Sequence, residues 1–257
     1  MHLKDRLLKR ELTIGSWITI GNTSVAEIMA NAGYDWLTVD MEHSGITINV
    51  AQELIRVIEL SGVTPLVRVS ANDPTLIKRV MDAGAHGVIV PMVNTPEEAE
   101  RAVKSVKYPP EGFRGVGLAR AQKYGLGFEN YLEWNSSKSI VIVQIEHINA
   151  VKNLREILTV DGVDGYIVGP YDLSGSLGVP GQFDHPEVKN ALKQISTVAK
   201  ELNALSGFHV VPIDYEPFEE KVDEGYKFIA HGLDSLFLAK GCETIMKKIT
   251  PLKQKTT

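Results

Sequence analysis

Two kinds of segment alternate along the chain, as judged from the spacing of its hydrophobic and polar positions. Short runs of Val, Ile and Leu are typical of strands buried on both faces of a parallel sheet. They predict strands at Ser16–Ile20, Trp36–Asp40, Pro65–Val69, Gly87–Val90, Ser139–Glu146, Gly165–Val168, Gly207–Val211 and Lys227–Ala230. Apolar residues three and four positions apart predict helices at Val25–Ala32, Ile48–Leu60, Thr75–Ala83, Pro96–Val106, Asn149–Leu158, Pro186–Leu202 and Pro217–Glu224.

Eight strands that alternate with helices predict a closed (β/α)8 TIM barrel of the α/β class, formed as one domain over residues 1–257. An open doubly wound sheet is the alternative, but no G-x-G-x-x-G motif follows the first strand. The connection at 108–137 is too long for a simple loop. Loops of that length in a compact domain usually have a function or cover a neighbour.

Composition narrows the class of protein. The chain has 257 residues, of which 44% are hydrophobic and 23% charged, with a formal net charge of −5 and a single cysteine. The acidic balance argues against a nucleic-acid partner, and one cysteine excludes an intrachain disulfide. We find no apolar leader and no run long enough for a membrane helix, so we expect a cytoplasmic protein with no membrane partner.

Polar residues at strand ends are the candidates for chemistry, because barrel active sites form where the strands finish. The second strand ends in Asp40-Met41-Glu42-His43, where His43 is either a general base or part of a surface loop. Arg68 lies inside an apolar run and needs an anion, which is either a protein carboxylate or a substrate oxygen. By itself Asp82 indicates only the last turn of a helix.

Two acids end neighbouring strands. Alternation sends Gln144 and Glu146 to the same side of the fifth strand, and the sixth strand leads into Asp172. Such a pair is either a ligand set for a hard divalent cation or a pair of capping acids. A Schiff-base lysine would be the rival chemistry, but no lysine lies well inside a predicted strand, which favours a metal. The segment from Tyr171 resembles a helix start, whose N–H groups suit a substrate carboxylate.

Six motifs in order resemble the HpcH/HpaI family of class II pyruvate aldolases, which includes 4-hydroxy-2-oxoheptanedioate and 2-dehydro-3-deoxyglucarate aldolases. The resemblance covers nearly the whole chain. The motifs are AGYDWLTVDMEH (32–43), PLVRV (65–69), IKRVMDAGAHGVIVPMV (77–93), YPPEGFRGVG (108–117), VQIE (143–146) and VDGYIVGPYDLSGSLG (163–178).

The resemblance implies roles that the residues alone leave open. It implies Mg²⁺, Mn²⁺ or Co²⁺ on Glu146 and Asp172, and a homo-oligomer, typically a hexamer, formed through a C-terminal helix near 233–252. The implied catalytic residues are His43 for the proton, Arg68 for the enolate, Asp82 for the basicity of the histidine, and Asp40. The implied substrate-binding residues are Gln144, Tyr171 and Asp172.

The implied reaction is the reversible cleavage of a 4-hydroxy-2-oxo acid, such as a 2-keto-3-deoxy sugar acid, into pyruvate and an aldehyde. Tyr171, His147 and His209 depart from the family pattern, and His209 falls near the position that lines the aldehyde pocket. Because imidazoles supply hydrogen bonds, we expect a polar aldehyde. The alternatives are a related lyase acting on phosphoenolpyruvate or an acyl-CoA, and a barrel that binds without catalysis.

Overall fold

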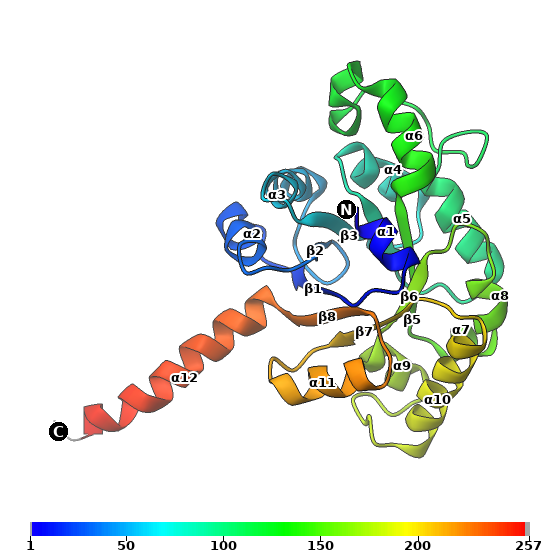
Figure 1. Ribbon diagram of the computed structural model, residues 1–257. Coiled ribbons are helices and arrows are strands. Elements are labelled where there is room, and N and C mark those ends of the chain that lie inside the picture. Colours follow the sequence, from blue (N-terminus) through cyan, green and yellow to red (C-terminus); the bar gives the residue numbers. More distant parts are fainter. Residues whose placement is uncertain (1, 255–257) are drawn as a thin grey trace.

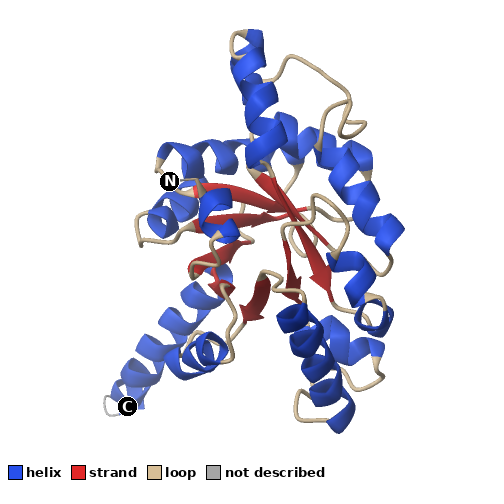
Figure 2. Ribbon diagram, turned by 45° about the vertical axis from the view of Figure 1, so that its right-hand side comes forward, coloured by secondary structure: helices blue, strands red, loops and turns tan. Residues whose placement is uncertain are grey.

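Eight parallel strands close into a barrel in sequence order in the computed structural model, which describes residues 2–254 (Figure 1). The strands are β1 (Thr13–Ile18), β2 (Trp36–Asp40), β3 (Thr64–Arg68), β4 (Gly87–Val90), β5 (Ile140–Ile145), β6 (Gly165–Val168), β7 (Ser206–Val210) and β8 (Phe228–Leu233). Figure 2 shows the helices arranged around the strands. The predicted (β/α)8 barrel is therefore confirmed.

The helices follow the predicted alternation, with local differences. They are α1 (Leu3–Leu8), α2 (Thr23–Ala30), α3 (Ile48–Leu60), α4 (Pro74–Asp82), α5 (Pro96–Val106), the 3₁₀ helix η1 (Arg120–Gly125), α6 (Phe128–Lys138), α7 (Ile148–Lys152), α8 (Leu154–Leu158), α9 (Pro170–Ser176), α10 (Pro186–Glu201), α11 (Tyr215–Asp223) and α12 (Asp234–Gln254). The helix predicted at Asn149–Leu158 is two short helices, because Asn153 leaves the helical conformation with φ −99° and ψ 14°.

Large apolar side chains fill the interior at the end where the strands begin. Trp36 of β2 and Phe228 of β8 stack with their ring centroids 4.1 Å apart. Gly15 stands beside Trp36 in the strand register, and a Cβ at Gly15 would overlap the indole. Leu3 and Leu7 of α1 belong to the same cluster. This end of the barrel is therefore a packed core, in which each such side chain stabilises the fold by about 1.5–3 kcal/mol.

A second apolar layer lies between the strands and the surrounding helices. On α3 the stripe of Ala51, Leu54, Ile55 and Ile58 is fully buried, as the period of an amphipathic helix requires. The long connection at 108–137 forms η1 and α6, which stand out from one side of the barrel in Figures 1 and 2. We call residues 108–138 the arm.

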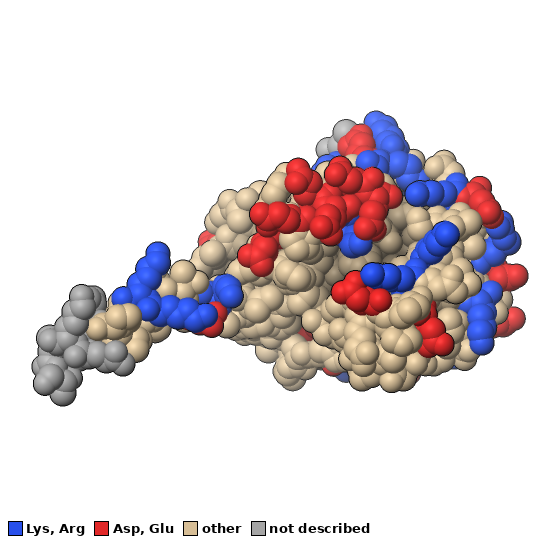
Figure 3. All heavy atoms as spheres, turned by 90° about the horizontal axis from the view of Figure 1, so that it is seen from below, with Lys and Arg blue, Asp and Glu red and all other residues tan. Residues whose placement is uncertain are grey.

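The last helix, α12, leaves the barrel and extends away from it (Figure 1). The Asp234 carboxylate fixes its start by accepting hydrogen bonds from the backbone N–H groups of Thr19, at 2.9 Å, and Ile20, at 2.8 Å. Figure 3 shows acidic side chains gathered on one face of the barrel and basic ones on the projecting helix. None of the helices within residues 2–254 combines the length and the apolar character that crossing a membrane requires.

Candidate active site

Polar side chains meet inside the barrel at the end where the strands finish. Side chains two residues apart on a strand point to the same face. Asp40 therefore points into the barrel like Trp36 on β2, Arg68 does so like Leu66 on β3, and the two are paired in the strand register. Beside them is a cavity of about 420 Å³. Its lining residues are Trp17, His43, Arg68, Gln144, Ile167, Val168, Gly169, Pro170, Tyr171, Asp172, His209 and Val211.

Arg68 is fixed by Asp40. Its Nε and Nη2 donate to the two Asp40 oxygens at 2.9 and 2.6 Å, and its guanidinium lies 4.3 Å from the centroid of the Trp17 ring. Burial raises the pKa of Asp40, but the hydrogen bonds and charge of Arg68 outweigh burial, so this pKa lies below its ordinary value. Asp40 is thus the anion that the sequence required for Arg68, while Nη1 makes no bond to Asp40 and faces Glu42.

Glu42 is a charged neighbour that the sequence analysis did not select. Its Oε2 lies 3.3 Å from Nη1 of Arg68 and 3.7 Å from Nε2 of His43, and it is buried without a hydrogen bond. Burial raises the pKa of Glu42 to about 7; Arg68 opposes this shift, and the charges of Asp40 and Asp172 add to it. Glu42 lies two residues beyond Asp40, the last residue of β2. The period of two of a strand, continued past its end, was the signal in the sequence that could have identified it.

Glu146 lies just beyond β5 and is 2% exposed. One carboxylate oxygen accepts the backbone N–H of Met92 at 2.7 Å, and the other accepts the side-chain amide of Gln144. Burial raises the pKa of Glu146 to about 7. The two hydrogen bonds lower this pKa, whereas the negative charges of Glu42 and Asp172 raise it further. The amide oxygen of Gln144 is also buried and has no hydrogen-bond partner among the described residues.

Asp172 and Tyr171 stand in the first turn of α9, immediately after β6. Before them Gly169 lets the backbone pass close to the acid of β5, since a Cβ there would lie 2.8 Å from Oε2 of Glu146. Tyr171 is half-exposed and packs edge-on against Phe183 with ring centroids 4.9 Å apart. The strand ends therefore bring Gln144 and Asp172 to the cavity, with Glu146 directly beside Gln144.

These groups fit a hard divalent cation. Glu42, Glu146 and Asp172 act on one another through their negative charges, and oxygens of Glu42 and Gln144 are buried without partners. A bound cation would reduce the repulsion between the carboxylates and give the buried oxygens a partner, because carboxylate and amide oxygens are its preferred ligands. Across residues 2–254, no three His, Cys, Asp or Glu side chains form a ready-made metal cluster, so only a two-carboxylate site with further open positions fits.

His43 and Asp82 lie apart in this chain. His43 lines the cavity from the loop after β2, and its side chain is 61% exposed. Asp82 ends α4, which leads into the start of β4 at the opposite end of the barrel. There its carboxylate accepts a hydrogen bond of 2.6 Å from the buried Arg114. Within one chain Asp82 therefore pairs with an arginine and does not contact the histidine.

The two unusual histidines have different surroundings. His209 of β7 faces the cavity, 5.3 Å from the Trp17 ring, with Nε2 3.3 Å from the Gly232 carbonyl oxygen. Burial lowers the pKa of His209 to about 3, so its imidazole is neutral. His147 instead caps α7, where Nδ1 accepts the backbone N–H of Asn149 at 3.1 Å. Only His209 is thus placed to meet a substrate.

A barrel with neighbouring carboxylates and a fixed arginine at its strand ends is typical of metal-assisted enzymes that act on small molecules, and known proteins narrow the class. The family model of HpcH/HpaI aldolase/citrate lyase matches residues 13–240. The chain is 40% identical to a hydroxypyruvate/pyruvate aldolase of Sagittula stellata, over 91% of this chain and 92% of that protein. It is 37% identical to a 4-hydroxy-2-oxo-heptane-1,7-dioate aldolase of Klebsiella pneumoniae, over 99% and 96% of the two chains.

Solved structures agree. An HpcH/HpaI aldolase/citrate lyase family protein from Burkholderia cenocepacia superposes with a TM-score of 0.91 at 33% identity, covering 96% of this chain and 98% of that one. The citrate synthase SbnG gives a TM-score of 0.84 at 29% identity, covering 99% and 98%.

The chain belongs to the HpcH/HpaI aldolase/citrate lyase family, as the sequence motifs predicted. It is a carbon–carbon lyase of the aldolase type, in a family whose members depend on divalent metals. The aldolase relatives therefore exclude the alternative of a barrel that binds a ligand without catalysis.

Proposed function

We propose that the chain is a class II pyruvate aldolase that reversibly cleaves a 4-hydroxy-2-oxo acid into pyruvate and an aldehyde. The observation that carries the proposal is the group of three neighbouring carboxylates, Glu42, Glu146 and Asp172, at the strand ends beside an arginine that Asp40 holds in place. The aldolase relatives at 37–40% identity over more than nine-tenths of the chain support the same reaction.

Glu146 and Asp172 would hold the cation, which we propose to be Mg²⁺, Mn²⁺ or Co²⁺. When bound, it would polarise the oxygens of the 2-oxo acid as a Lewis acid. The hydrogen bonds from Met92 and Gln144 keep the Glu146 carboxylate in one orientation before the cation arrives. Gln144 and the turn at Tyr171 lie beside the acids and would position the pyruvate half.

Arg68 would stabilise the enolate. Asp40 occupies the Nε–Nη2 edge of the guanidinium. Nη1 lies 3.3 Å from Glu42 without a hydrogen bond to it, and would be the donor to an oxygen that gains negative charge. The Trp17 ring beneath the guanidinium holds it in the same plane. Because these donors are fixed before reaction, no reorganisation is needed when the charge develops.

His43 would move the proton. In cleavage it takes the proton of the C4 hydroxyl, the C3–C4 bond breaks, and its electron pair enters the enolate while the aldehyde departs. The enolate then takes up a proton at C3 and leaves as pyruvate; synthesis reverses these steps. Glu42, between Nη1 of Arg68 and Nε2 of His43, would orient both groups.

His209 would contact the aldehyde. Its Nε2 lies beside the Gly232 carbonyl and its ring is neutral, so Nδ1 is left as a hydrogen-bond acceptor toward the cavity. An acceptor there favours an aldehyde that carries a hydroxyl group. Since His147 is engaged in capping α7, we assign the preference for a polar aldehyde to His209 alone.

We further propose a homo-oligomer, a hexamer, in which α12 packs on a second copy. Leu238, Ile245, Met246 and Ile249 of α12 are exposed in one chain, as an unpaired helix face would be. The role expected of Asp82 beside His43 also needs a neighbouring copy, because one chain keeps them at opposite ends. Two predictions from the sequence remain: a single domain over residues 1–257, of which the structure describes 2–254, and a cytoplasmic location. Light scattering tests the proposed assembly, and cell fractionation tests the location.

The deciding experiment measures pyruvate release from 4-hydroxy-2-oxo acids. We expect release to stop with EDTA and to return with Mn²⁺ or Mg²⁺, while Glu146→Gln stays inactive in all conditions. Release that EDTA leaves unchanged would overturn the metal-dependent mechanism. The alternative lyase is tested in the same assay, because turnover of phosphoenolpyruvate or an acyl-CoA without pyruvate release would replace the aldolase reaction.

A further inference from the structure

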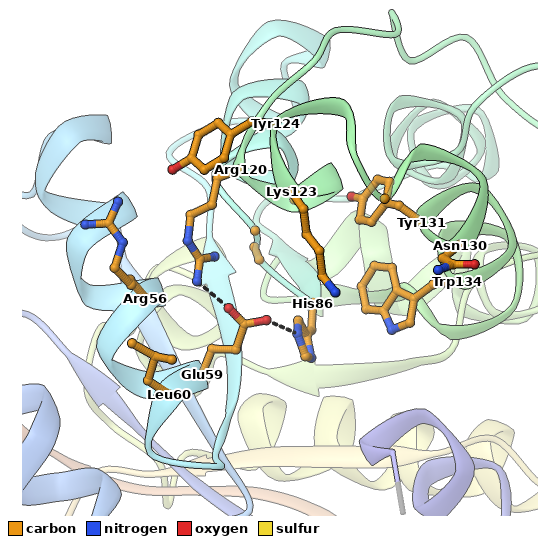
Figure 4. Close-up of a pocket in the computed structure, with 14 residues that line it drawn as sticks. Arg56, Glu59, Leu60, His86, Arg120, Lys123, Tyr124, Asn130, Tyr131 and Trp134 are labelled. Carbon is orange, nitrogen blue, oxygen red and sulfur yellow. Dashed lines mark hydrogen bonds and ion pairs between the residues drawn. The ribbon is translucent and has the colours of Figure 1, made fainter.

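A second hollow of the described structure lies away from the proposed catalytic cavity. It measures about 580 Å³ and lies between α3, the turn before β4 and the arm (Figure 4). We call it the arm cleft. Because strands β3 and β4 begin at this edge of the barrel, the arm cleft and the catalytic cavity lie at opposite barrel ends. Its volume is in the range of sites that enclose drug-sized ligands.

The floor of the arm cleft is a fixed ion-pair network. Glu59 accepts a hydrogen bond from Arg120 and lies 3.4 Å from Nε2 of His86 (Figure 4). The bond with His86, followed by the charge of Arg120, lowers the pKa of Glu59 to about 2 in spite of its burial. Gly84 makes room for Arg120, whose Nη1 would meet a Cβ there and donates to the Ala83 carbonyl at 3.0 Å. The acid is therefore neutralised in place and does not repel an anion.

One cation of the arm cleft has no acid. Arg56 pairs with Glu53 at 2.5 Å and Arg120 with Glu59, but within residues 2–254 no carboxylate lies in ion-pair range of Lys123. Figure 4 shows the Lys123 side chain reaching into the arm cleft toward His86 and Trp134. Two of the three cationic side chains that line the hollow are therefore compensated, and the charge of Lys123 favours an anionic ligand.

The backbone holds Lys123 in this position at a cost. Lys123 and Tyr124 both have left-handed conformations, with φ of 53° and 57°, which cost about 1 kcal/mol or more each for such residues. The turn is kept by the bond from the Tyr124 N–H to the Ala119 carbonyl at 2.9 Å and by Gln122, which is buried against Tyr108. A strained turn that aims a free ammonium into a hollow is a common feature of ligand sites.

The wall of the arm cleft is aromatic. Trp134 stacks on Tyr131 with centroids 5.4 Å apart, and the His86 ring meets it edge-on at 5.1 Å. These two contacts fix the indole, which lines the arm cleft. A rigid indole offers a planar ring a stacking surface beside the ammonium of Lys123.

We propose that the arm cleft binds an organic anion that carries a planar ring, with the ring on Trp134 and the negative group on Lys123 and Arg120. The ligand is either a nucleoside phosphate or an aromatic carboxylate, because both combine a flat ring with an anionic group. Within one chain this site is separate from the proposed catalytic cavity.

Trp134 supplies the reporter for the test. The whole enzyme is titrated with adenosine monophosphate, benzoate, adenosine and inorganic phosphate while tryptophan fluorescence is followed. We expect saturable quenching by a ring-bearing anion, with adenosine and phosphate at least about tenfold weaker than the adenosine monophosphate they compose. The tighter of adenosine monophosphate and benzoate identifies the ligand type. Trp134→Phe should abolish the signal, which separates it from quenching of Trp17 in the catalytic cavity.

Lys123→Gln should weaken binding by about tenfold or more, as loss of a charged hydrogen bond predicts, without changing pyruvate release. Lys193→Gln, an exposed lysine of α10, is the matched control and should leave binding unchanged. The proposal is overturned by no saturable quenching at millimolar probe, by equal affinity in Lys123→Gln, or by phosphate binding as tightly as adenosine monophosphate. It is also overturned if Lys123→Gln dissociates the assembly while no probe binds, because a second copy would then fill the arm cleft.

Discussion

The two ends of the barrel differ in whether their acidic side chains are paired with basic ones. Where the strands begin, Asp164 pairs with Lys4 and accepts the Val141 N–H at 2.9 Å, and Asp35 pairs with Arg6 in the same manner. Where the strands finish, the pKa values of the partly buried Glu42 and the buried Glu146 rise to about 7. The first arrangement closes a core, whereas the second leaves negative charge that a cation and a substrate would stabilise.

The largest effect should come from the one arginine at the acidic end. In Arg68→Lys the single ammonium nitrogen cannot bond both Asp40 oxygens and also occupy the position of Nη1. We expect kcat to fall by about 10³-fold, the range seen when a fixed transition-state donor is lost. Steady-state rates of pyruvate release measure this loss.

Arg6→Lys is the matched change at the other end. Its side chain is a quarter exposed, so the change should cost no more than about 1 kcal/mol in unfolding free energy and leave kcat unchanged. If both variants lost turnover equally, the contrast between the barrel ends would be wrong.

The stability of the metal-free protein should depend on pH because of Glu42 and Glu146. Folding raises the pKa of each carboxyl from 4.5 to about 7, so the native state holds these protons more tightly than the unfolded state. Stability is therefore lost as pH rises from about 4.5 to 7, by up to about 3 kcal/mol for Glu146.

Thermal unfolding in EDTA at pH 5 and pH 8 measures this slope. Glu146→Gln should flatten it, and Mn²⁺ should raise Tm more at pH 8 than at pH 5. If the stability of the metal-free protein rose between pH 5 and pH 8, the raised pKa values of Glu42 and Glu146 would be wrong.

Glu42→Gln tests whether the acid between Arg68 and His43 orients the proton-transfer group. We expect kcat to fall by about 10–100-fold with KM little changed. The acidic limb of the pH–rate profile, where the base takes up a proton, should shift to lower pH, since the carboxylate no longer faces the imidazole. Glu42→Asp should recover part of the rate. A purely structural role would lower Tm and leave the pH profile in place.

His209→Leu should have the smallest effect, and only on the aldehyde. Replacing the neutral acceptor by an aliphatic group should shift kcat/KM toward apolar aldehydes by about tenfold, with the KM for pyruvate unchanged. Product analysis with a panel of aldehydes measures the shift, and an unchanged preference would rule out the role of His209.

Strand alternation allowed much of the fold and the site to be predicted. The eight apolar runs predict the barrel, and the period of two places Gln144 and Glu146 on one side of β5. Exact ends were less accurate, since β1 covers Thr13–Ile18 where Ser16–Ile20 was expected, because packing rather than composition decides where a strand begins. The resemblance supplied roles for His43 and Arg68 that spacing left open.

The sequence by itself determined the parallel barrel, through its eight apolar runs, and the need of Arg68 for an anion, because a guanidinium inside an apolar run keeps its charge. Tertiary structure alone decided that Glu42 faces both Arg68 and His43, that Asp82 pairs with Arg114, and that His147 caps a helix while His209 enters the cavity. These outcomes depend on distances between residues far apart in the chain and on burial, which raises the pKa of an acid only once the fold has removed water from it.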